Sequence, residues 1–290
     1  MQVVRILEQT VRQLAGEIGE RNLWTAYSNL VAAAEWIESE WTAMGYTVHR
    51  QTYTVEGRSC WNVEAVLPGT TSPWETVIVG AHYDTVPDTP GADDNASGVA
   101  VLMALAHRFR HTVCRRTVRF VAFVNEEPPF FQTPTMGSWV YAHACHTRGD
   151  RVIAMLSLES IGYFSDAPGS QRFPIDIPFR WFYSDRGNFI AFVSNLASRR
   201  LLRRVVHSFR RATDLPVERG ALPAWIPGVD WSDQWAFWRH GYPAVMVTDT
   251  ALYRNPAYHL PDDTPDSLDY TAMARVTQGL TAVIQDLANA

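Results

Sequence analysis

The stretch TVIVGAHYDTVPDTPGADDNASGVAVLMALAHR, residues 76–108, decides the fold. Its first part, Thr76 to Ala81, is a short apolar run, which is typical of a strand buried on both faces. From Val99 to Arg108 the apolar residues return at helical spacing. A buried strand that leads through a polar segment into a helix is a unit from which parallel sheets are built.

The same alternation continues along the chain. Two more apolar runs, Val118 to Val124 and Val152 to Leu158, follow, and a helical stretch separates each run from the next. Continuous apolar strands need cover on both faces, unlike strands with one face in water. We therefore predict an α/β fold with a mostly parallel sheet that helices cover on both sides.

Further elements extend this core at both ends. We expect helices at about residues 2–18, 26–45, 195–213 and 269–288, and strands at about residues 47–56, 60–67, 188–193 and 243–247. A Pro- and aromatic-rich stretch at about 163–185 is expected to be an irregular surface excursion near the site. Because no linker, repeat or low-complexity segment interrupts the 290 residues, we predict a single domain over residues 1–290.

Composition limits the partners. A net charge of -5 and a pI near 6.0 argue against nucleic acid and anionic membranes, which both need a basic surface. The arginines of residues 199–211 alternate with apolar residues at helical spacing, so we interpret them as the solvated face of a helix; a patch for an anion or a partner is the alternative. The N-terminal segment has no apolar run of the length that a signal peptide or a membrane span needs, and we expect a cytoplasmic protein.

Polar residues just after the first apolar run point to a site. Ligands of such sheets collect outside the carboxyl ends of the strands. The strand period places His82 and Asp84 on one side, and a histidine held by a carboxylate is the usual arrangement of a zinc ligand. A polar turn with the same residues is the alternative.

Acidic residues recur before the helix that follows. Asp93 and Asp94 lie between small residues, which leave room for a close approach to the backbone. One carboxylate can bridge two cations about 3.5–4 Å apart, as in two-metal hydrolases. The alternative is that both acids only interact with the dipole at the start of the helix.

Two further strands end on acids. Val118 to Val124 leads into Glu126 and Glu127, and a buried strand rarely does so, because uncompensated charge there is costly. A metal would compensate Glu127 and leave Glu126 free to take a proton from a metal-bound water, whereas an acidic surface turn is the alternative. Glu159 ends the third run in the same way.

A second histidine completes a set of metal ligands. His259 lies in the loop before the last helix, and with His82 it gives two imidazoles beside three carboxylates. The three cysteines, Cys60, Cys114 and Cys145, lie far apart and are interpreted as small buried residues, so nitrogen and oxygen must bind the metal. This ligand set suits zinc better than magnesium or calcium, although manganese or cobalt could also occupy it.

In their order along the chain, these residues resemble the zinc-dependent aminopeptidases of metallopeptidase family twenty-eight. The motifs that carry the resemblance are His82-x-Asp84, the Gly-Ala-Asp-Asp-Asn-Ala-Ser-Gly stretch 91–98, Glu126-Glu127 and Tyr258-His259. The resemblance implies a three-layer α/β/α sandwich on a twisted, mixed sheet and two zinc ions per chain. It implies a zinc-dependent exopeptidase that hydrolyses the N-terminal peptide bond of a peptide with a free N-terminus.

The resemblance also implies a role for each residue. One zinc would take His82 and Glu159, the other would take Glu127 and His259, and Asp94 would bridge them. Asp84 would orient His82, Glu126 would act as general base on a zinc-bound water, and a cis peptide bond is expected between Asp94 and Asn95.

Three positions at the site carry less support. The Tyr258 hydroxyl is a candidate donor to the developing oxyanion, with plain packing as its alternative. Glu159 stands where the best-known members of the family have Asp. Gln234 stands where the family often has His, so no role follows for it.

Two other functions remain open from the sequence. A glutaminyl cyclase-like acyltransferase shares the scaffold but uses one zinc, and a non-catalytic binding domain on the same scaffold would tend to lose its ligands. Candidates for shaping the pocket for the first side chain are Phe130, Phe131, Trp139, Tyr163 and Trp225, with core packing as the alternative for most of them. The sequence does not indicate the preferred N-terminal residue, the length of peptide or the oligomeric state.

Overall fold

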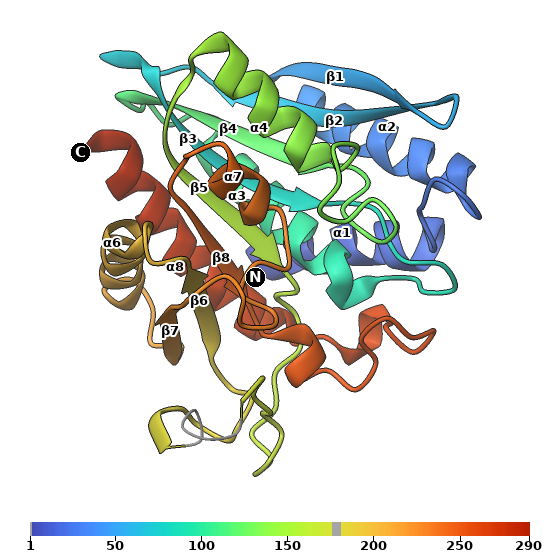
Figure 1. The fold of residues 1–290 in the computed structure, drawn as a ribbon, viewed down its shortest axis with the longest axis vertical. Helices are drawn as coiled ribbons and strands as arrows, with labels where there is room; N and C mark the ends of the chain where they lie inside the picture. Colours follow the sequence, from blue (N-terminus) through green and yellow to red (C-terminus); the bar gives the residue numbers. More distant parts are fainter. Residues whose placement is uncertain (1, 176–180) are drawn as a thin grey trace.

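A computed structural model describes residues 2–175 and 181–290 of the chain, and within them one mixed sheet of eight strands forms the centre (Figure 1). Its strand order is β1-β2-β4-β3-β5-β8-β6-β7. The strands are β1 Thr47–Val55, β2 Arg58–Leu67, β3 Ser72–His82, β4 Arg116–Phe123, β5 Arg151–Glu159, β6 Ile190–Ser194, β7 Val217–Ala221 and β8 Ala244–Thr248.

The middle of the sheet is parallel and its edges are not. Strands β4, β3, β5 and β8 are parallel to their neighbours in that order, whereas β1 and β2 form an antiparallel hairpin that joins the antiparallel edge of β4. On the other side β6 is antiparallel to β8 and parallel to β7. The parallel centre brings the carboxyl ends of β3, β4 and β5 to the same edge.

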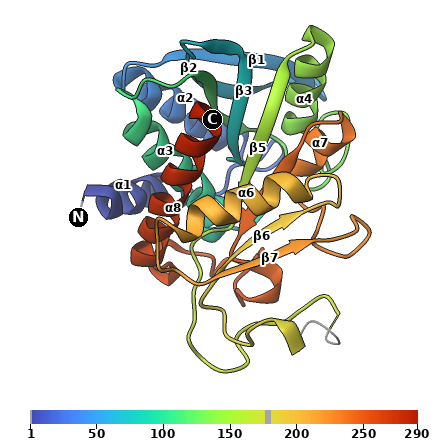
Figure 2. The ribbon, with the colours of Figure 1, turned by 90° about the vertical axis from the view of Figure 1, so that its left-hand side faces the viewer.

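Helices cover both faces of the sheet (Figure 2). They are α1 Gln2–Val11, α2 Tyr27–Ala43, α3 Gly98–Phe109, α4 Gly137–Arg148, α6 Arg199–Arg210, α7 Gln234–Arg239 and α8 Tyr270–Asn289, with short helical segments at Arg12–Ile18, Ala92–Ser97, Ala251–Tyr253 and Pro265–Ser267. Helices α1, α2, α3, α6 and α8 contribute to the larger core on one face, and α4 and α7 pack on the other face. This is the predicted three-layer α/β/α sandwich.

The stretch 76–108 lies at the centre of the molecule. Val77, Ile78 and Val79 of β3 are fully buried, and α3 buries apolar residues on all sides between the sheet and α1 and α8. Gly80 cannot carry a side chain, because a Cβ there would lie 2.2 Å from the Phe123 ring. Tight packing therefore fixes where β3 ends, and with it the position of His82.

The predicted elements are present, with changes at the periphery. Strand β7 and the short helix α7 were not predicted, and the expected helix at 195–213 begins only at Arg199. In α6 the residues Leu201, Val205 and Phe209 are buried and the arginines face outward, as expected for a solvated face. The described residues of the excursion at about 163–185 contain no strand, and residues 176–180 lie outside the described chain.

The lengths and hydropathy of the helices bear on the expectation that the chain contains no membrane span. Among the residues that the structure describes, no helix is both long enough and apolar enough to cross a bilayer.

Candidate active site

The predicted site residues converge at the carboxyl edge of the parallel strands. His82 is the last residue of β3, Glu159 is the last residue of β5, and Glu126 and Glu127 follow β4. The remaining members come from loops: Asp94 lies in the segment Ala92–Ser97 that precedes α3, and His259 follows Ala251–Tyr253. All of these side chains are buried except that of His259, which is 31% exposed.

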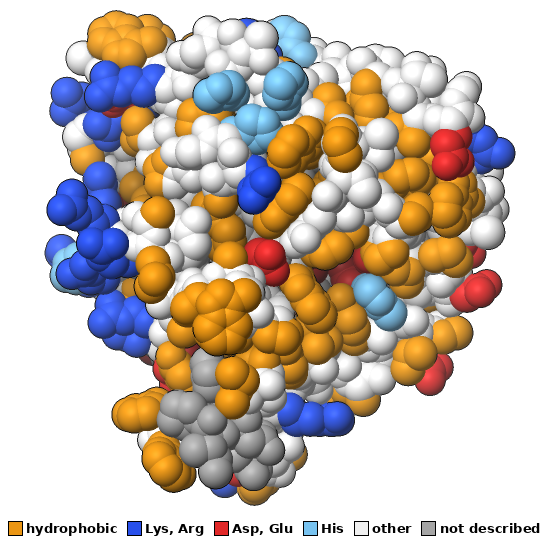
Figure 3. All heavy atoms as spheres, in the orientation of Figure 1, with side chains coloured by type: hydrophobic (Ala, Val, Ile, Leu, Met, Phe, Trp, Pro, Cys, Tyr) orange, Lys and Arg blue, Asp and Glu red, His pale blue; other side chains and the backbone are white. Residues whose placement is uncertain are grey.

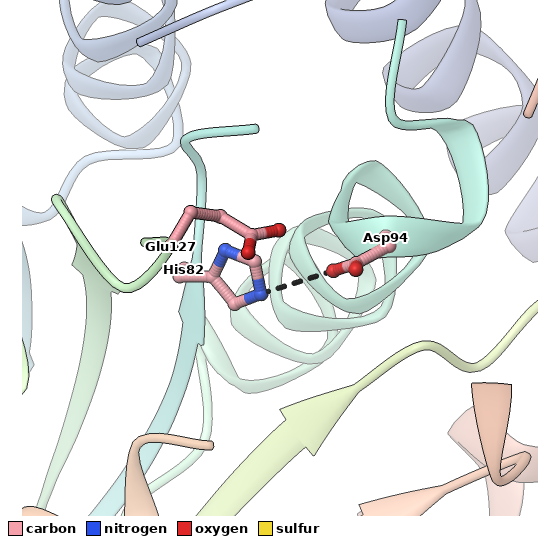
Figure 4. A group of neighbouring side chains, drawn as sticks. All are labelled: His82, Asp94 and Glu127. Carbon is pink, nitrogen blue, oxygen red and sulfur yellow. Dashed lines mark ion pairs between the residues drawn. The ribbon is translucent and has the colours of Figure 1, made fainter. Parts of the chain in front are cut away.

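Asp94 lies between the two imidazoles. Its Oδ1 atom is 3.2 Å from His82 Nε2, and its Oδ2 atom is 2.9 Å from His259 Nε2. Figure 4 shows His82, Asp94 and Glu127 directed toward a shared space, with the His82–Asp94 contact dashed. One carboxylate thus faces a different histidine with each oxygen.

Each histidine also faces one glutamate. Glu159 Oε2 is 3.3 Å from His82 Nε2, and Glu127 Oε1 is 3.4 Å from His259 Nε2. These ion-pair contacts form two groups that share Asp94, while ligand atoms of Glu127 also lie within 4.8 Å of those of His82 and Asp94. Glu159 reaches His82 although it is one methylene longer than the aspartate of the best-known members.

The donor set fits a cation. Both ring nitrogens of His82, Asp94 Oδ1 and Glu127 Oε1 are buried without a hydrogen bond in the described part of the chain. A buried polar atom without a partner costs about 1–3 kcal/mol. Within the described residues, ligand atoms of His82, Asp94 and Glu127 lie within 4.8 Å of one another. Imidazole nitrogens with carboxylate oxygens are ligands that zinc accepts.

The pKa shifts show that the cluster stabilises positive charge. Burial lowers the pKa of His82, but Glu159 and Glu126 outweigh it and raise the pKa well above the usual value. Burial also lowers the pKa of His259, but contacts with Asp94 and Glu127 outweigh it and raise the pKa to about 10. A metal ion bound there would compete with protons for these imidazoles.

The pKa values of the two adjacent glutamates are raised as well. Burial raises the pKa of Glu127 to about 7, with a further contribution from Asp94. Burial also raises the pKa of Glu126 well above its usual value; His82 lowers it, while Glu127 and Glu159 add to the rise. Glu126 Oε2 lies 3.9 Å from His82 Nε2, at the border of the cluster.

Asp84 does more than face His82. Its Oδ1 atom is 3.6 Å from His82 Nδ1, which is longer than a hydrogen bond. Its two oxygens accept hydrogen bonds from the main-chain N–H groups of Glu126 and Glu127, both at 3.1 Å. Asp84 therefore ties the end of β3 to the turn after β4, a role that the sequence does not indicate.

Asn95 joins the start of α3 to the end of β5. The peptide bond between Asp94 and Asn95 is cis, as the resemblance implies. The Asn95 side chain donates to Leu158 O at 2.8 Å and accepts from the N–H groups of Ser160 and Gly98. These contacts fix the distance between Asp94 and Glu159.

Further polar residues, which the sequence analysis did not assign, support the cluster. The Asp263 carboxylate accepts from the main-chain N–H groups of Asp93 and Asp94. Ser232 Oγ donates to Glu159 Oε2 at 2.7 Å. Gln234 is buried and donates to Val229 O, so its side chain supports the chain before α7.

Arg21 stabilises the loop between β3 and α3 through hydrogen bonds to main-chain carbonyl groups. It is fully buried, and its guanidinium donates to the carbonyl oxygens of Leu14, Gly19, Tyr83, Pro90 and Gly91. Burial lowers the pKa of Arg21 to about 10, and the nearby Asp84, Asp263 and Asp94 oppose that fall. The Arg21 guanidinium thus holds main chain next to the acidic cluster, and no local sequence motif predicts this role.

A cavity of about 130 Å³ opens beside the cluster. Glu159 and Tyr258 line it where it meets the cluster, and Ala191, Val193, Leu222 and Met246 give it apolar walls. None of the aromatic candidates Phe130, Phe131, Trp139, Tyr163 and Trp225 lines this cavity, whereas Phe130 lines another cavity together with Glu127, so their part in shaping the pocket for the first side chain stays a prediction. Figure 3 shows acidic side chains surrounded by hydrophobic ones on this face of the molecule.

Tyr258 lies between the cavity and the second histidine. Its ring stacks on the His259 ring with centroids 3.8 Å apart and 19° between the planes. Burial raises the pKa of the Tyr258 hydroxyl, which therefore stays protonated. The ring thus packs against His259, and its hydroxyl remains available as a donor.

Solved structures share this fold. A zinc aminopeptidase from Bacillus subtilis superposes with a TM-score of 0.79 at 14% identity, covering 99% of this chain and 95% of that one. LapB from Legionella pneumophila gives 0.76 at 22% identity, covering 98% of this chain and 72% of that one. A glutaminyl cyclase from Fimbriiglobus ruber gives 0.70 at 22% identity, over 97% of this chain and 94% of that one. At these identities the likeness concerns the fold alone.

Relatives by sequence are closer. An Escherichia coli protein described as uncharacterized, YfbL, is 40% identical over 286 residues, which are 96% of this chain and 86% of that protein. A probable leucine aminopeptidase of Trichophyton verrucosum is 29% identical over 73% of this chain. The chain spans about half of the fungal protein, 53% of its length.

The family follows from the sequence match over most of the chain. This sequence match confirms the family and the class of enzyme that the motifs predict. With residues 62–284 matching the model of Peptidase family M28, the chain belongs to this family of peptidases.

Proposed function

We propose that this chain is a zinc-dependent aminopeptidase that removes the N-terminal residue from peptides, with two zinc ions per chain. The observation that carries the proposal is the position of Asp94, whose two oxygens face two histidines that each face a separate glutamate. His82, Glu159 and Asp94 would hold one ion, and His259, Glu127 and Asp94 the other. Bound there, zinc would polarise the scissile carbonyl and lower the pKa of a water molecule.

Glu126 is the proposed general base. It is buried beside the cluster, yet its closest approach to a histidine, 3.9 Å, leaves it outside the two groups that share Asp94. Its carboxylate would take a proton from the attacking water and return it to the leaving amine, so that it is regenerated in each turnover. The Tyr258 hydroxyl would donate to the carbonyl oxygen as negative charge develops there.

The cavity beside the cluster supports removal of the N-terminal residue. Glu159 lines this cavity, and a carboxylate there attracts the ammonium group of a free N-terminus. The walls beyond it are apolar, so the first side chain of the peptide is expected to be apolar as well. Names of the relatives, among them a probable leucine aminopeptidase, support this substrate class.

We also propose that residues 1–290 act as one peptidase domain. The N-terminal helix α1 packs on α3 and α8, and Arg21 reaches into the loop that carries the site. The family match begins only at residue 62, yet the preceding elements complete both the sheet and the support of the site.

A panel of aminoacyl-p-nitroanilides tests the function. We expect hydrolysis of leucyl and phenylalanyl substrates to exceed that of glutamyl and arginyl ones, and Glu126→Gln to lower kcat by at least about 100-fold. Glu35→Gln, at an exposed position on α2, is the matched control and should retain activity. Full activity of Glu126→Gln would refute its role as base. Cyclisation of an N-terminal glutamine without hydrolysis would favour the glutaminyl cyclase alternative instead.

A further inference from the structure

Three histidines gather on the outer face of the molecule, apart from the carboxylate cluster. His143 and His146 lie on α4, and His240 follows the last residue of α7. The His240 ring centroid is 5.5 Å from that of His143 and 5.9 Å from that of His146. Figure 3 shows histidine side chains gathered over α4 and α7, above the acidic region of the same face.

The ring centroids lie near the separation of two imidazoles on one metal ion, but the ring nitrogens of the three histidines do not lie within 4.8 Å of one another, so rings must turn for the three to share an ion. Two imidazoles on one tetrahedral zinc, at Zn–N distances of about 2.0–2.1 Å, hold their ring centroids roughly 5 Å apart. His240 lies near this distance from both other rings. His143 and His146 are three residues apart on a helix and therefore share one face of it.

The ring of His240 is already oriented as a ligand. Its Nδ1 atom is 2.8 Å from Ala236 O, and a carbonyl only accepts, so Nδ1 carries the hydrogen and Nε2 keeps a free lone pair. Metal-binding histidines commonly donate their other N–H group to a carbonyl in this way. Trp139 packs edge-on against the ring with centroids 4.6 Å apart, which restricts its rotation.

Charge around His240 favours the neutral form that binds metals. Burial lowers its pKa, and His143, His146 and Arg239 lower it further. Arg148, on the same helix as two of the histidines, is engaged by Asp150 at 2.7 Å. The lowered pKa of His240 therefore favours the neutral imidazole, the form that binds a metal ion.

We propose that His143, His146 and His240 form a second metal site, on the surface, for a divalent transition-metal ion such as Zn²⁺, Ni²⁺ or Cu²⁺. Imidazole ligands suit these ions, whereas magnesium and calcium prefer oxygen. His240 is fixed, and the exposed His143 and His146 turn toward it on binding. Three protein ligands leave a fourth position open to water or to a ligand from solution.

Equilibrium dialysis of the zinc-loaded protein against increasing free Zn²⁺ tests the site. We expect wild type to bind one ion more per chain than His240→Gln, at a free zinc concentration at which the catalytic centre is saturated in both. Loss of an outer contact alone weakens metal binding by about 10–100-fold, so loss of a ligand should cost at least tenfold. The count is a difference between two proteins and does not depend on how many ions the carboxylate cluster holds.

Two further variants keep the test decisive. The double variant His143→Gln/His146→Gln changes only exposed side chains, so it decides the question even if His240→Gln fails to fold. His49→Gln, at an exposed position on β1, is the matched control and should bind as wild type does. Binding curves of the double variant that coincide with those of wild type would overturn the proposal, as would an equal loss in His49→Gln.

Discussion

The carboxylate cluster and the surface histidine cluster place the same side chain in opposite surroundings. At the ends of β3 and β5 acids surround His82 and raise its pKa, whereas over α4 and α7 burial, with neighbouring imidazoles and Arg239, lowers the pKa of His240. The first environment attracts a cation by charge, and the second offers only lone pairs. We therefore expect the first site to bind metal more tightly and to matter far more for activity and stability.

Removal of metal should reveal the largest difference between the two sites in their effect on activity. Chelation of wild type should abolish aminopeptidase activity, because the proposed reaction depends on zinc at the carboxylate cluster, and added Zn²⁺ should restore it. It should also lower Tm, since free zinc at 100 times its Kd stabilises the folded state by about 2.7 kcal/mol. In contrast, His143→Gln/His146→Gln should keep its activity. Activity that survives complete chelation would contradict the proposed function.

The next largest effect should come from Arg21, which supports the carboxylate cluster from within. A lysine cannot reach all five carbonyl oxygens that the guanidinium contacts, and each acceptor left unpaired costs about 1–3 kcal/mol. We expect Arg21→Lys to lower the free energy of unfolding by at least about 3 kcal/mol in urea titrations. Arg5→Lys, at an exposed position on α1, is the control. Equal stability of both variants would show that the buried scaffold is dispensable.

A single hydrogen bond to a proposed ligand should have a moderate effect. Ser232→Ala removes the donor to Glu159 Oε2, and loss of such a contact weakens metal affinity by about 10–100-fold. Competition with a chromophoric chelator measures this directly. Ser39→Ala, at an exposed position on α2, should leave the zinc affinity unchanged. An unchanged affinity in Ser232→Ala would argue against Glu159 as a ligand.

The smallest effect should be the pH dependence of His240. Its pKa is lowered in the folded protein, so the unfolded chain takes up the proton at a higher pH, near the ordinary value of about 6.5. The stability that neutral His240 contributes is present above that value and is lost as the pH falls below it. Urea titrations at about pH 7 and about pH 5 should therefore show a smaller loss for His240→Gln than for wild type. Identical losses would contradict the lowered pKa.

The central strands could be predicted because their burial appears directly in the sequence. The run Val77 to Val79 is buried on both faces, and so are the corresponding parts of β4 and β5. Strand β7 escaped prediction because it is short and carries Glu218 and Arg219 at partly exposed positions, so neither an apolar run nor a clear alternation marks it.

The residues of the site likewise include some that could be predicted from the sequence and some that could not. Acids and histidines at strand ends are conspicuous, and the structure brings all six of the metal-ligand and general-base candidates together. Arg21, Asn95 and Asp263 could not be predicted, because their partners are main-chain groups that only the folded chain brings near. The cavity walls were missed for the same reason, since Ala191, Leu222 and Met246 come from three different strands or loops.

A crystal structure of the zinc-loaded protein, with anomalous data collected at the zinc edge, tests the central claim most directly. We predict two peaks beside Asp94, about 3.5–4 Å apart, one next to His82 and Glu159 and the other next to His259 and Glu127. A single peak there in zinc-saturated, active protein, or peaks that lie away from Asp94, would contradict the two-zinc centre.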